Sequence, residues 1–422
     1  MIFDKLKFLI SLGVFFVTYS GLILADFPFF RMKRHRIALL GAFLTLAAGL
    51  LSLRQAYQAV DFHTIFLLMG IMVLVEALYL SGFFKQLSEG ADRIRMTPLQ
   101  FLAITILVSG LFSAFLINDV VCLALTPFVI HIANKMKLKP LPYLMALATA
   151  SNIGSSATLT GNPQNIIIAG VSHISYLYFI ERVGPIALVG LGIDFLLLAF
   201  IYRKEFRISA EINSNPSKMI LHPSKVEEPV DQRMIWKGVS ITFLTIILFF
   251  TGIPLVWTAL GAGILTLFLF TGKRIEILKQ MDWNLLLLFI GLFIVIKGFE
   301  LHVLKELKTG GIQTAILASL PKFTAASVIL SNLVSNVPAV LLFKPFVESV
   351  LPPARTILWI ALAMSSTLAG NLTLIGSIAN LIVAEKASRE KINLSFWYYL
   401  KGGFFITLFT AAFGTAWLYF VK

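Results

Sequence analysis

The sequence predicts an all-α polytopic membrane protein with two inverted repeats, about ten transmembrane helices, two re-entrant hairpins and two broken helices. Three observations predict this class. The chain of 422 residues is 58% hydrophobic and only 13% charged, which is more apolar side chain than a soluble surface can hide. Apolar segments of about 20 residues, each able to cross a bilayer core roughly 30 Å thick, recur from end to end. Blocks of sequence in the first half also recur, in the same order, in the second.

The apolar segments define the expected helices. We expect crossings near residues 8 to 25, 36 to 53, 63 to 84, 140 to 168, 183 to 202, 234 to 252, 254 to 272, 283 to 302, 354 to 382 and 395 to 421. Two further stretches, 98 to 134 and 311 to 350, are interrupted by polar residues, so each is expected to enter and leave on one side as a hairpin. A β-barrel is excluded because its strands would alternate with a period of two and would be half as long. No small-residue cleavage site precedes the basic cluster RMKRHR, so the first segment is interpreted as a retained helix rather than a signal peptide.

The net charge of +14 is interpreted as a topology signal. With these crossings most lysines and arginines fall on one side, which the positive-inside rule assigns to the cytoplasm, with both termini outside. The expected organisation is N-terminal scaffold helices at 1–60, repeat 1 at 61–202, a cytoplasmic linker at 203–233, scaffold helices at 234–281 and repeat 2 at 282–422. Repeat 1 contains the hairpin 98–134 and the broken helix 140–168. Repeat 2 contains the hairpin 311–350, the broken helix 354–382 and the last helix 395–421.

Three matching blocks support the repeat. VDFHTIFLLMGIMVLVEALYL matches MDWNLLLLFIGLFIVIKGFEL, and aligning Asp61 with Asp282 gives an offset of 282 − 61 = 221. NDVVCLALTPFV from Asn118 matches NVPAVLLFKPFV from Asn336, with an offset of 336 − 118 = 218. SNIGSSATLTGNPQN matches STLAGNLTLIGSIAN with an offset of 366 − 151 = 215. An odd number of crossings separates the two aspartates, which inverts the second copy, as in many secondary transporters.

The third block is polar at membrane depth. Its glycines and proline break the helix, and backbone groups freed there are tolerated only inside the protein or around a ligand cavity. Its Ser, Thr and Asn side chains supply neutral oxygens and amides suited to sodium or an oxyanion, and the N–H groups of each resumed half-helix favour an anionic or oxygen-rich solute. Together with the hairpin tips, the candidate substrate- and ion-binding residues, expected to converge near the midplane, are Asn118, Asp119, Asn152, Ser155, Ser156, Thr158, Asn162, Asn165, Ser335, Asn336, Asn371, Thr373, Ser377 and Asn380.

The segments SSATLTGNPQNIII, GNLTLIGSIANLIV, FLINDVVCLALTPFV and SNLVSNVPAVLL resemble the ion transporter superfamily of arsenite permeases, divalent-anion symporters, citrate carriers and NhaD-type antiporters. The resemblance covers nearly the whole chain. It implies two facing hairpins, two broken helices, a homodimer formed through scaffold helices, and elevator-like movement of a transport domain. It also implies that the hairpin tips and helix breaks form the ion and substrate site.

The function expected from these features is ion-coupled secondary transport. In the resembling dicarboxylate symporters both hairpin tips read Ser-Asn-Thr, whereas here they read Ile117-Asn118-Asp119 and Ser335-Asn336-Val337. We therefore expect a small inorganic anion or metalloid oxyacid, arsenite-like, carried by alternating access. A sodium-coupled symporter of dicarboxylate or sulfate-type anions and a sodium/proton antiporter are the alternatives. A channel is less well supported, because inverted broken helices fit alternating access better than a continuous pore.

Three charged residues raise separate hypotheses. Asp119 is either a coupling-ion site or a cap of the hairpin tip, and the coupling role is favoured because carboxylates inside membranes are usually functional. Glu76 and Lys297 occupy equivalent positions, since 76 + 221 = 297. They are either a structural ion pair, two separately snorkelling side chains, or part of the coupling mechanism.

Enzymatic function is not expected. The chain has no GxxxxGK[ST] phosphate loop and no HExxH, and no base lies near Ser155 or Ser156 in sequence. The single cysteine, Cys122, excludes an internal disulfide, and the scattered histidines predict no metal site. We expect no cofactor beyond a coupling proton or sodium ion, which would use the candidate residues above. The expected partners are a small solute and the lipid bilayer, not nucleic acid, and the expected location is the cytoplasmic (inner) membrane.

Overall fold

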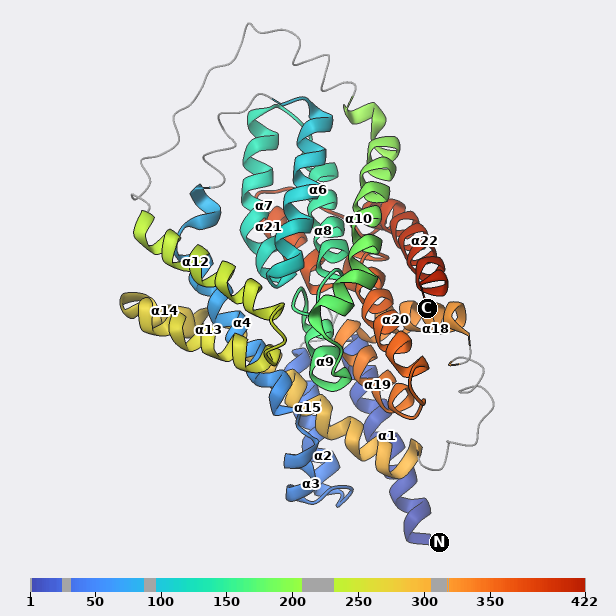
Figure 1. The fold of residues 1–422 in the computed structure, drawn as a ribbon. Helices are drawn as coiled ribbons and strands as arrows, with labels where there is room; N and C mark the ends of the chain where they lie inside the picture. Colours follow the sequence, from blue (N-terminus) through green and yellow to red (C-terminus); the bar gives the residue numbers. More distant parts are fainter. Residues whose placement is uncertain are drawn as a thin grey trace, which may run out of the picture.

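The computed structural model describes residues 2–24, 32–86, 96–206, 231–304, 317 and 319–421, and every regular element in these ranges is a helix (Figure 1). Most of the predicted linker, part of the second hairpin segment and the cations Arg31, Arg93 and Arg95 lie outside the described residues. The first half contains α1 (Ile2–Leu24), α2 (Arg34–Ala47), α3 (Leu53–Ala59), α4 (Phe62–Leu80), α6 (Pro98–Phe115), α7 (Asn118–Lys135), α8 (Leu141–Ser155), α9 (Pro163–Ser172) and α10 (Tyr176–Ile201). The second half contains α12 (Gln232–Phe249), α13 (Leu255–Leu269), α14 (Arg274–Gln280), α15 (Trp283–Phe299), α18 (Leu320–Val334), α19 (Asn336–Glu348), α20 (Ala354–Ala369), α21 (Ile378–Arg389) and α22 (Phe396–Phe420).

The predicted all-α class with two hairpins and two broken helices is confirmed. α6 and α7 form the first hairpin and α18 and α19 the second. α8 with α9, and α20 with α21, are the two broken helices. In Figure 1 the first hairpin extends upward from the centre and α19 extends downward, while α9 lies in the lower part and α21 behind α7 in the upper part. This opposite placement is the inversion that the repeat requires.

The repeat also includes helices that precede the matching sequence blocks. α2 and α13 begin at residues 34 and 255, and α3 and α14 at 53 and 274, so both pairs keep an offset of 221. These helices pack across the halves: α4 of the first half packs on α13 of the second, and α15 of the second packs on α2 of the first. A Cβ at Gly70 would lie 2.2 Å from the carbonyl oxygen of Ala259, and one at Gly291 would lie 2.6 Å from the carbonyl carbon of Ala38. Small residues thus let the backbones approach at two equivalent crossings, which interlocks the repeats.

Several helices are shorter than a membrane span. In the described part of the chain seven helices are long and apolar enough to cross a bilayer, and α13 with the following segment makes a further pair bent by 94°. The expected crossing at 36 to 53 contains α2, which has only 14 residues. α8 and α20 have 15 and 16 residues, and their side chains are almost all buried. The broken helices therefore form a central core that other helices shield from lipid.

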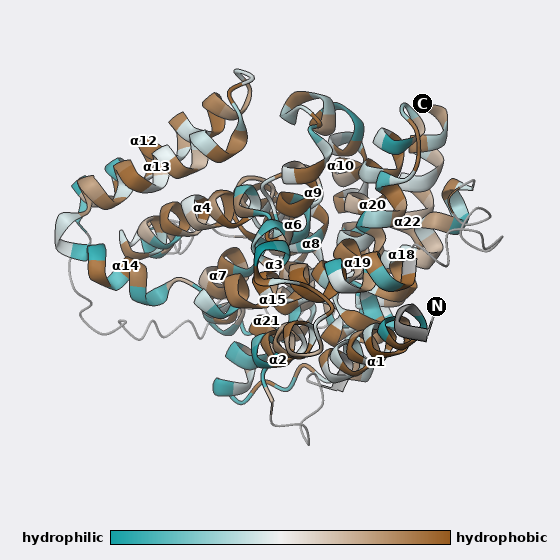
Figure 2. Cartoon of the chain, turned by 90° about the horizontal axis from the view of Figure 1, so that it is seen from below, coloured by the Kyte–Doolittle hydropathy of each residue, from teal (hydrophilic) through white to brown (hydrophobic). Residues whose placement is uncertain are grey.

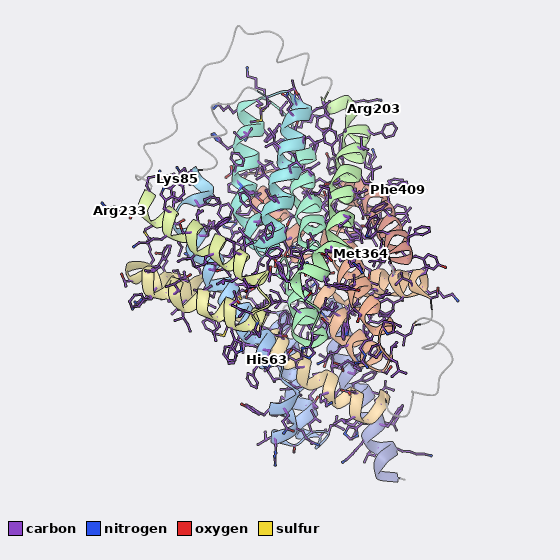
Figure 3. All side chains as sticks on the ribbon, viewed as in Figure 1. His63, Lys85, Arg203, Arg233, Met364 and Phe409 are labelled. Atoms are coloured by element: carbon purple, nitrogen blue, oxygen red, sulfur yellow. The ribbon has the colours of Figure 1, made fainter. Side chains whose placement is uncertain are left out.

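The outer surface agrees with a membrane environment. In Figure 2 α12 and α13 reach outward and are brown along most of their length. Large apolar side chains are exposed on both helices, among them Trp236, Phe243, Trp257 and Phe268. In Figure 3 the cations Lys85, Arg203 and Arg233 lie toward the upper end of the molecule and His63 lies toward the lower end. These three cations belong to the side predicted to face the cytoplasm.

Candidate functional site

Each helix break is held open by an asparagine of its own repeat. Asn165 Nδ2 donates to the carbonyl oxygens of Ser155 at 3.3 Å and Thr158 at 2.8 Å. Asn380 Nδ2 donates to those of Gly370 at 2.7 Å and Thr373 at 3.1 Å. All three pairs of equivalent residues have an offset of 215, as in 380 − 165 = 215. The carbonyls at the end of a half-helix have no intrahelical partner, so these two amides satisfy groups that the break leaves free.

Asn152 joins the two breaks across the repeat boundary. Its Nδ2 donates to Asn371 Oδ1 at 2.9 Å and to Asn380 Oδ1 at 3.0 Å. Its Oδ1 accepts from Asn118 Nδ2 at 3.1 Å and from Ser377 Oγ at 3.0 Å. An amide has two donor hydrogens and two acceptor lone pairs, so the hydrogen-bonding capacity of Asn152 is filled. This fully buried residue is the centre of the polar core.

Thr367 makes the reciprocal connection. It is the repeat equivalent of Asn152, since 367 − 152 = 215. Its Oγ1 accepts from Asn162 Nδ2 at 3.2 Å and Gln164 Nε2 at 3.1 Å, and it donates to Asn165 Oδ1 at 3.4 Å. The first half of each broken helix thus hydrogen-bonds the start of the second half of the other broken helix. Thr367 and Gln164 were not among the predicted site residues, although both lie in the matching blocks.

The two hairpin tips reach this polar core. The backbone N–H of Asn118 donates to the carbonyl of Gly161 at 3.1 Å. Asn336 is buried against the other break, where a Cβ on Gly370 would lie 3.3 Å from its Nδ2. Asn118 Oδ1 is buried and accepts no hydrogen bond from any described residue. A buried acceptor without a donor is costly, so this oxygen marks a position where a bound solute or ion would find an unused ligand.

Asp119 follows Asn118 in the first turn of α7, where it is half-buried. α7 has no side-chain cap, so the carboxylate does not bond the free N–H groups of the tip. Among the described residues Asp119 forms no ion pair or hydrogen bond, and its main electrostatic neighbour is another acid, Asp282. The cap hypothesis is therefore wrong in its hydrogen-bonding form, and the coupling role stays a prediction.

The tip of the second hairpin contacts a cation. Arg34 Nη1, at the start of α2, donates to Ser335 Oγ at 2.9 Å. Ser335 is held at φ +76°, in the region that L-residues rarely adopt. Tyr19 on α1 also donates to the carbonyl of Pro338 at 3.0 Å. The sequence placed Arg34 among the cytoplasmic cations and did not predict this contact, which joins residues 301 positions apart.

Three predicted residues lie at the margin of the core. Thr158 Oγ1 donates to the carbonyl of Ala114 on the first hairpin. Thr373 Oγ1 donates to Asn332 Oδ1 on the second hairpin at 3.1 Å. Ser156 Oγ donates to the carbonyl of Ile153 in its own helix at 2.6 Å. The two threonines therefore attach a break to its hairpin, while Ser156 has only a local bond.

The hypothesis of a Glu76–Lys297 ion pair is wrong. Lys297 Nζ pairs with Glu300 Oε2 at 3.0 Å, one helical turn away. Glu76 is 8% exposed and forms no ion pair within the described ranges. Equivalence in the repeat therefore does not bring these two side chains into contact.

Among the residues that the structure describes, the most deeply buried acid is one that the sequence analysis missed. Asp194 on α10 has 0% exposure, and both of its carboxylate oxygens lie 3.0 Å from Thr149 Oγ1. The carbonyl of Thr149 accepts from Asn371 Nδ2 at 3.2 Å, which connects Asp194 to the polar core through one residue. The available signal was a single carboxylate inside the apolar segment IALVGLGIDFLLLAF.

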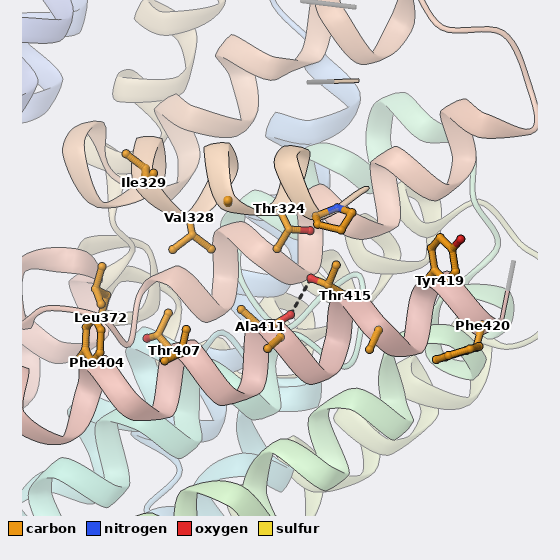
Figure 4. Close-up of a pocket in the computed structure, with 15 residues that line it drawn as sticks. Thr324, Val328, Ile329, Leu372, Phe404, Thr407, Ala411, Thr415, Tyr419 and Phe420 are labelled. Atoms are coloured by element: carbon orange, nitrogen blue, oxygen red, sulfur yellow. Dashed lines mark hydrogen bonds between the residues drawn. The ribbon is translucent and has the colours of Figure 1, made fainter. Parts of the chain in front are cut away.

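A separate cavity of about 730 Å³ opens between α18 and α22 (Figure 4). Its lining is mainly apolar, with Val328, Ile329 and Phe404 on its walls. The hydroxyl of Thr415 in this lining donates to the carbonyl of Ala411 in its own helix at 2.7 Å. An apolar cavity at a surface that faces lipid suits an acyl chain, so we do not assign it to a polar solute.

Comparisons with known proteins place this architecture in a family. The model of the family described as CitMHS, citrate transporter, matches residues 22–364. The silicon efflux transporter LSI3 of Oryza sativa subsp. japonica is 31% identical over 473 residues, covering 96% of both chains. The putative transporter arsB of Dictyostelium discoideum is 27% identical over 512 residues, covering 95% of this chain and 89% of its own.

A solved structure shares the fold. The crystal structure of the Alcanivorax borkumensis YdaH transporter aligns with a TM-score of 0.54 at 12% identity, covering 98% of each chain. The inner membrane protein YbiR of Escherichia coli (strain K12) is 30% identical over 347 residues, covering 81% of this chain and 84% of its own. The chain therefore belongs to the CitMHS citrate transporter family and is a multi-pass membrane transporter.

Proposed function

We propose that this protein is an ion-coupled secondary transporter of a small metalloid oxyacid, arsenite-like, or of a small inorganic anion. The observation that carries the proposal is the polar core around Asn152, which contains only neutral amides and hydroxyls together with the unused acceptor Asn118 Oδ1. Arsenous and silicic acids are small neutral hydroxides near pH 7. Each offers several O–H donors and oxygen acceptors, which match a site of amides without a compensating charge.

The relatives support this class of solute. One is named for silicon efflux and another as arsB. Because the core side chains bond one another directly, a bound solute must replace some of these bonds, and those across the repeat boundary join the two halves. Solute binding would therefore be linked to the relative position of the repeats, which is what alternating access requires.

Asp119 is proposed as the ligand of the coupling ion. It lies next to Asn118 at the tip and has no cationic partner among the described residues. A half-buried carboxylate of this kind favours binding of a proton or a sodium ion. The neutral oxygens of the core would complete a sodium site.

An anion symporter is the second candidate. Arg34 places a guanidinium at the tip of the second hairpin, beside Asn336. A fixed cation next to neutral amides would favour a carboxylate or sulfate over a neutral hydroxide. The family description as a citrate transporter agrees with this alternative.

The test is transport by purified protein in liposomes. Radiolabelled arsenite, sulfate and citrate are offered under imposed proton or sodium gradients, and internal pH is followed because electroneutral exchange carries no current. Saturable arsenite counterflow supports the proposal. Sodium-driven uptake of sulfate or citrate, without arsenite counterflow, would replace it with the anion symporter.

The location and assembly remain proposals as well. The protein is placed in the cytoplasmic membrane on the distribution of its cations. A homodimer through the scaffold helices follows from the family resemblance, and the exposed apolar side chains of α12 and α13 are available for it. Crosslinking of Trp257→Cys in native membranes would yield a dimer band if this face is the interface.

A further inference from the structure

The structure points to a second ion-binding position, distinct from the hairpin tips: we propose that Asp194, with Thr149 and Tyr399, forms a buried proton site that acts in addition to Asp119. This inference rests on the proposed function, because it adds a proton-binding residue to the same transport cycle. It starts from hydrogen-bond geometry around Thr149.

A count of hydrogens shows that the site can accept a proton. The Thr149 hydroxyl has one hydrogen, and four acceptors surround it, namely Met145 O at 2.9 Å, Ala146 O at 3.4 Å and both carboxylate oxygens of Asp194 at 3.0 Å. If that hydrogen bonds the Met145 carbonyl, an ionised Asp194 faces only lone pairs. A protonated Asp194 instead donates its own hydrogen to Thr149 Oγ1, and both bonds form. The site can therefore hold a protonated Asp194 without losing a hydrogen bond.

Among the described residues, the surroundings of Asp194 offer no cation that would stabilise a charged carboxylate. α10 packs against α6, α8, α20 and α22. Among the described residues Asp194 forms no ion pair with Lys, Arg or His. Lys401 on α22 is exposed, and Arg355 lies at the first turn of α20, four turns from the core. The titratable group that interacts with Asp194 from these helices is Tyr399, whose own further neighbours are Cys122 and Tyr202.

Tyr399 supplies the second independent observation. Its side chain is fully buried, and its hydroxyl has no hydrogen-bond partner within the described ranges. It interacts electrostatically with Asp194. A buried hydroxyl without a hydrogen-bond partner is unusual in a packed core.

The other repeat shows that the fold does not require this polar cluster. Ser175 and Ser395 cap α10 and α22 at an offset of 395 − 175 = 220, so Asp194 corresponds to Gly414. Thr149 corresponds to Met364 at an offset of 364 − 149 = 215. Gly414 and Met364 are also in contact, because a Cβ on the glycine would lie 2.3 Å from Met364 Sδ. The equivalent pair is apolar, so the fold that the two repeats share does not require a carboxyl at this position.

A path to the solute site is present. Thr149 O accepts from Asn371, and Asn371 Oδ1 accepts from Asn152. Rearrangement of the core amides when solute binds would therefore move Thr149, which bonds the proton-carrying Asp194. Release of the proton would leave a buried charge, which is strongly unfavourable unless the site opens to water. The proton and the solute would thus be coupled through Thr149 and Asn371.

The experiment separates proton binding from transport. Infrared difference spectra of the purified protein are recorded across a pH titration, and the wild type is expected to show the carbonyl stretch of a protonated carboxyl near neutral pH. Asp194→Asn should lack this band. Thr149→Val should shift its frequency, because the hydroxyl partner is removed. Ser109→Ala, which removes another buried hydroxyl that bonds α8, is the control and should leave the band unchanged.

Transport is then measured in the same variants. Asp194→Asn mimics the neutral acid, so proton-driven accumulation should fall at least about tenfold while solute counterflow stays within about twofold of the wild type. If Asp194→Asn fails to fold, the frequency shift in Thr149→Val decides. Two results would overturn the proposal: proton-driven accumulation in Asp194→Asn that equals that of the wild type, or an infrared carboxyl band that neither Asp194→Asn nor Thr149→Val changes. If the wild type transports nothing tested, the proposed function fails while the band still reports the proton site.

Discussion

The tip of the first hairpin carries the carboxylate of Asp119, whereas the tip of the second carries Ser335, which accepts a hydrogen bond from Arg34. Both tips otherwise present a buried asparagine to a helix break, Asn118 in one repeat and Asn336 in the other. The shared features are those that build the broken helices. The charged residues are not shared, so the fold does not require them, and they are the candidates for binding the ion and the solute.

This difference suggests a division of labour. The first tip, with an acid and the unused acceptor of Asn118, suits the coupling ion. The second tip, with the guanidinium of Arg34, suits an oxygen of the solute. Asn152 and Thr367 connect the two, since each bonds the break of the opposite repeat. The following substitutions test this comparison.

Removing the charge of the first tip should have the largest effect. In Asp119→Asn the coupling ion loses its charged ligand, so gradient-driven solute uptake in liposomes should fall by about a hundredfold or more, the equivalent of about 3 kcal/mol. Asp231→Asn is the control, because that aspartate caps α12 by accepting from the N–H of Arg233. Undiminished uptake in Asp119→Asn would remove the carboxylate from the mechanism.

Truncating the central amide should come next. Asn152→Ala removes the partner of Asn118 Nδ2, Asn371 Oδ1, Asn380 Oδ1 and Ser377 Oγ, and each unsatisfied buried group costs about 1–3 kcal/mol. We expect a lower melting temperature of the detergent-solubilised protein and weak solute binding. Ser156→Ala removes only a local helix bond and should melt close to the wild type. Equal melting of both variants would show that the crossed bonds do not stabilise the core.

The cation of the second tip should have a smaller and more selective effect. Arg34→Ala should raise the KM for solute about three- to tenfold, because one charge-assisted hydrogen bond is worth about 1 kcal/mol at a partly exposed position. Arg34→Lys should recover part of the affinity for an anion but not the geometry of the fork. A change in ion dependence without a change in the solute KM would show that Arg34 acts on the coupling ion rather than on the solute.

Regular patterns predicted much of this architecture. Apolar length gave the helices, and the offsets of 221, 218 and 215 gave the inverted repeat, the hairpins and the breaks. The crossed bonds could not be predicted, because Asn152 and Asn371 lie 219 positions apart and their contact depends on how two helices pack. Lys297 pairs with Glu300 rather than Glu76 because a residue one turn away is always within reach, whereas an equivalent residue in an inverted copy is not.

Two functional candidates show different limits of sequence reasoning. Arg34 looked like an ordinary topology cation within RMKRHR, and no local pattern indicates that it reaches Ser335. Asp194 could have been identified from the sequence, because a carboxylate in the middle of an apolar membrane segment usually has a function. Its apolar counterpart in the second repeat, Gly414 with Met364, became visible only once the helices were placed.

The central claim, that the first tip serves the ion and the second tip the solute, is tested most directly by one set of kinetic measurements. Initial uptake is measured in liposomes over a grid of solute and driving-ion concentrations for the wild type, Asp119→Asn and Arg34→Ala. The account predicts that Asp119→Asn abolishes the dependence on the ion while counterflow keeps its solute KM, and that Arg34→Ala raises the solute KM with the ion dependence intact. If both variants change both dependences alike, the tips form a single undivided site and the comparison is contradicted.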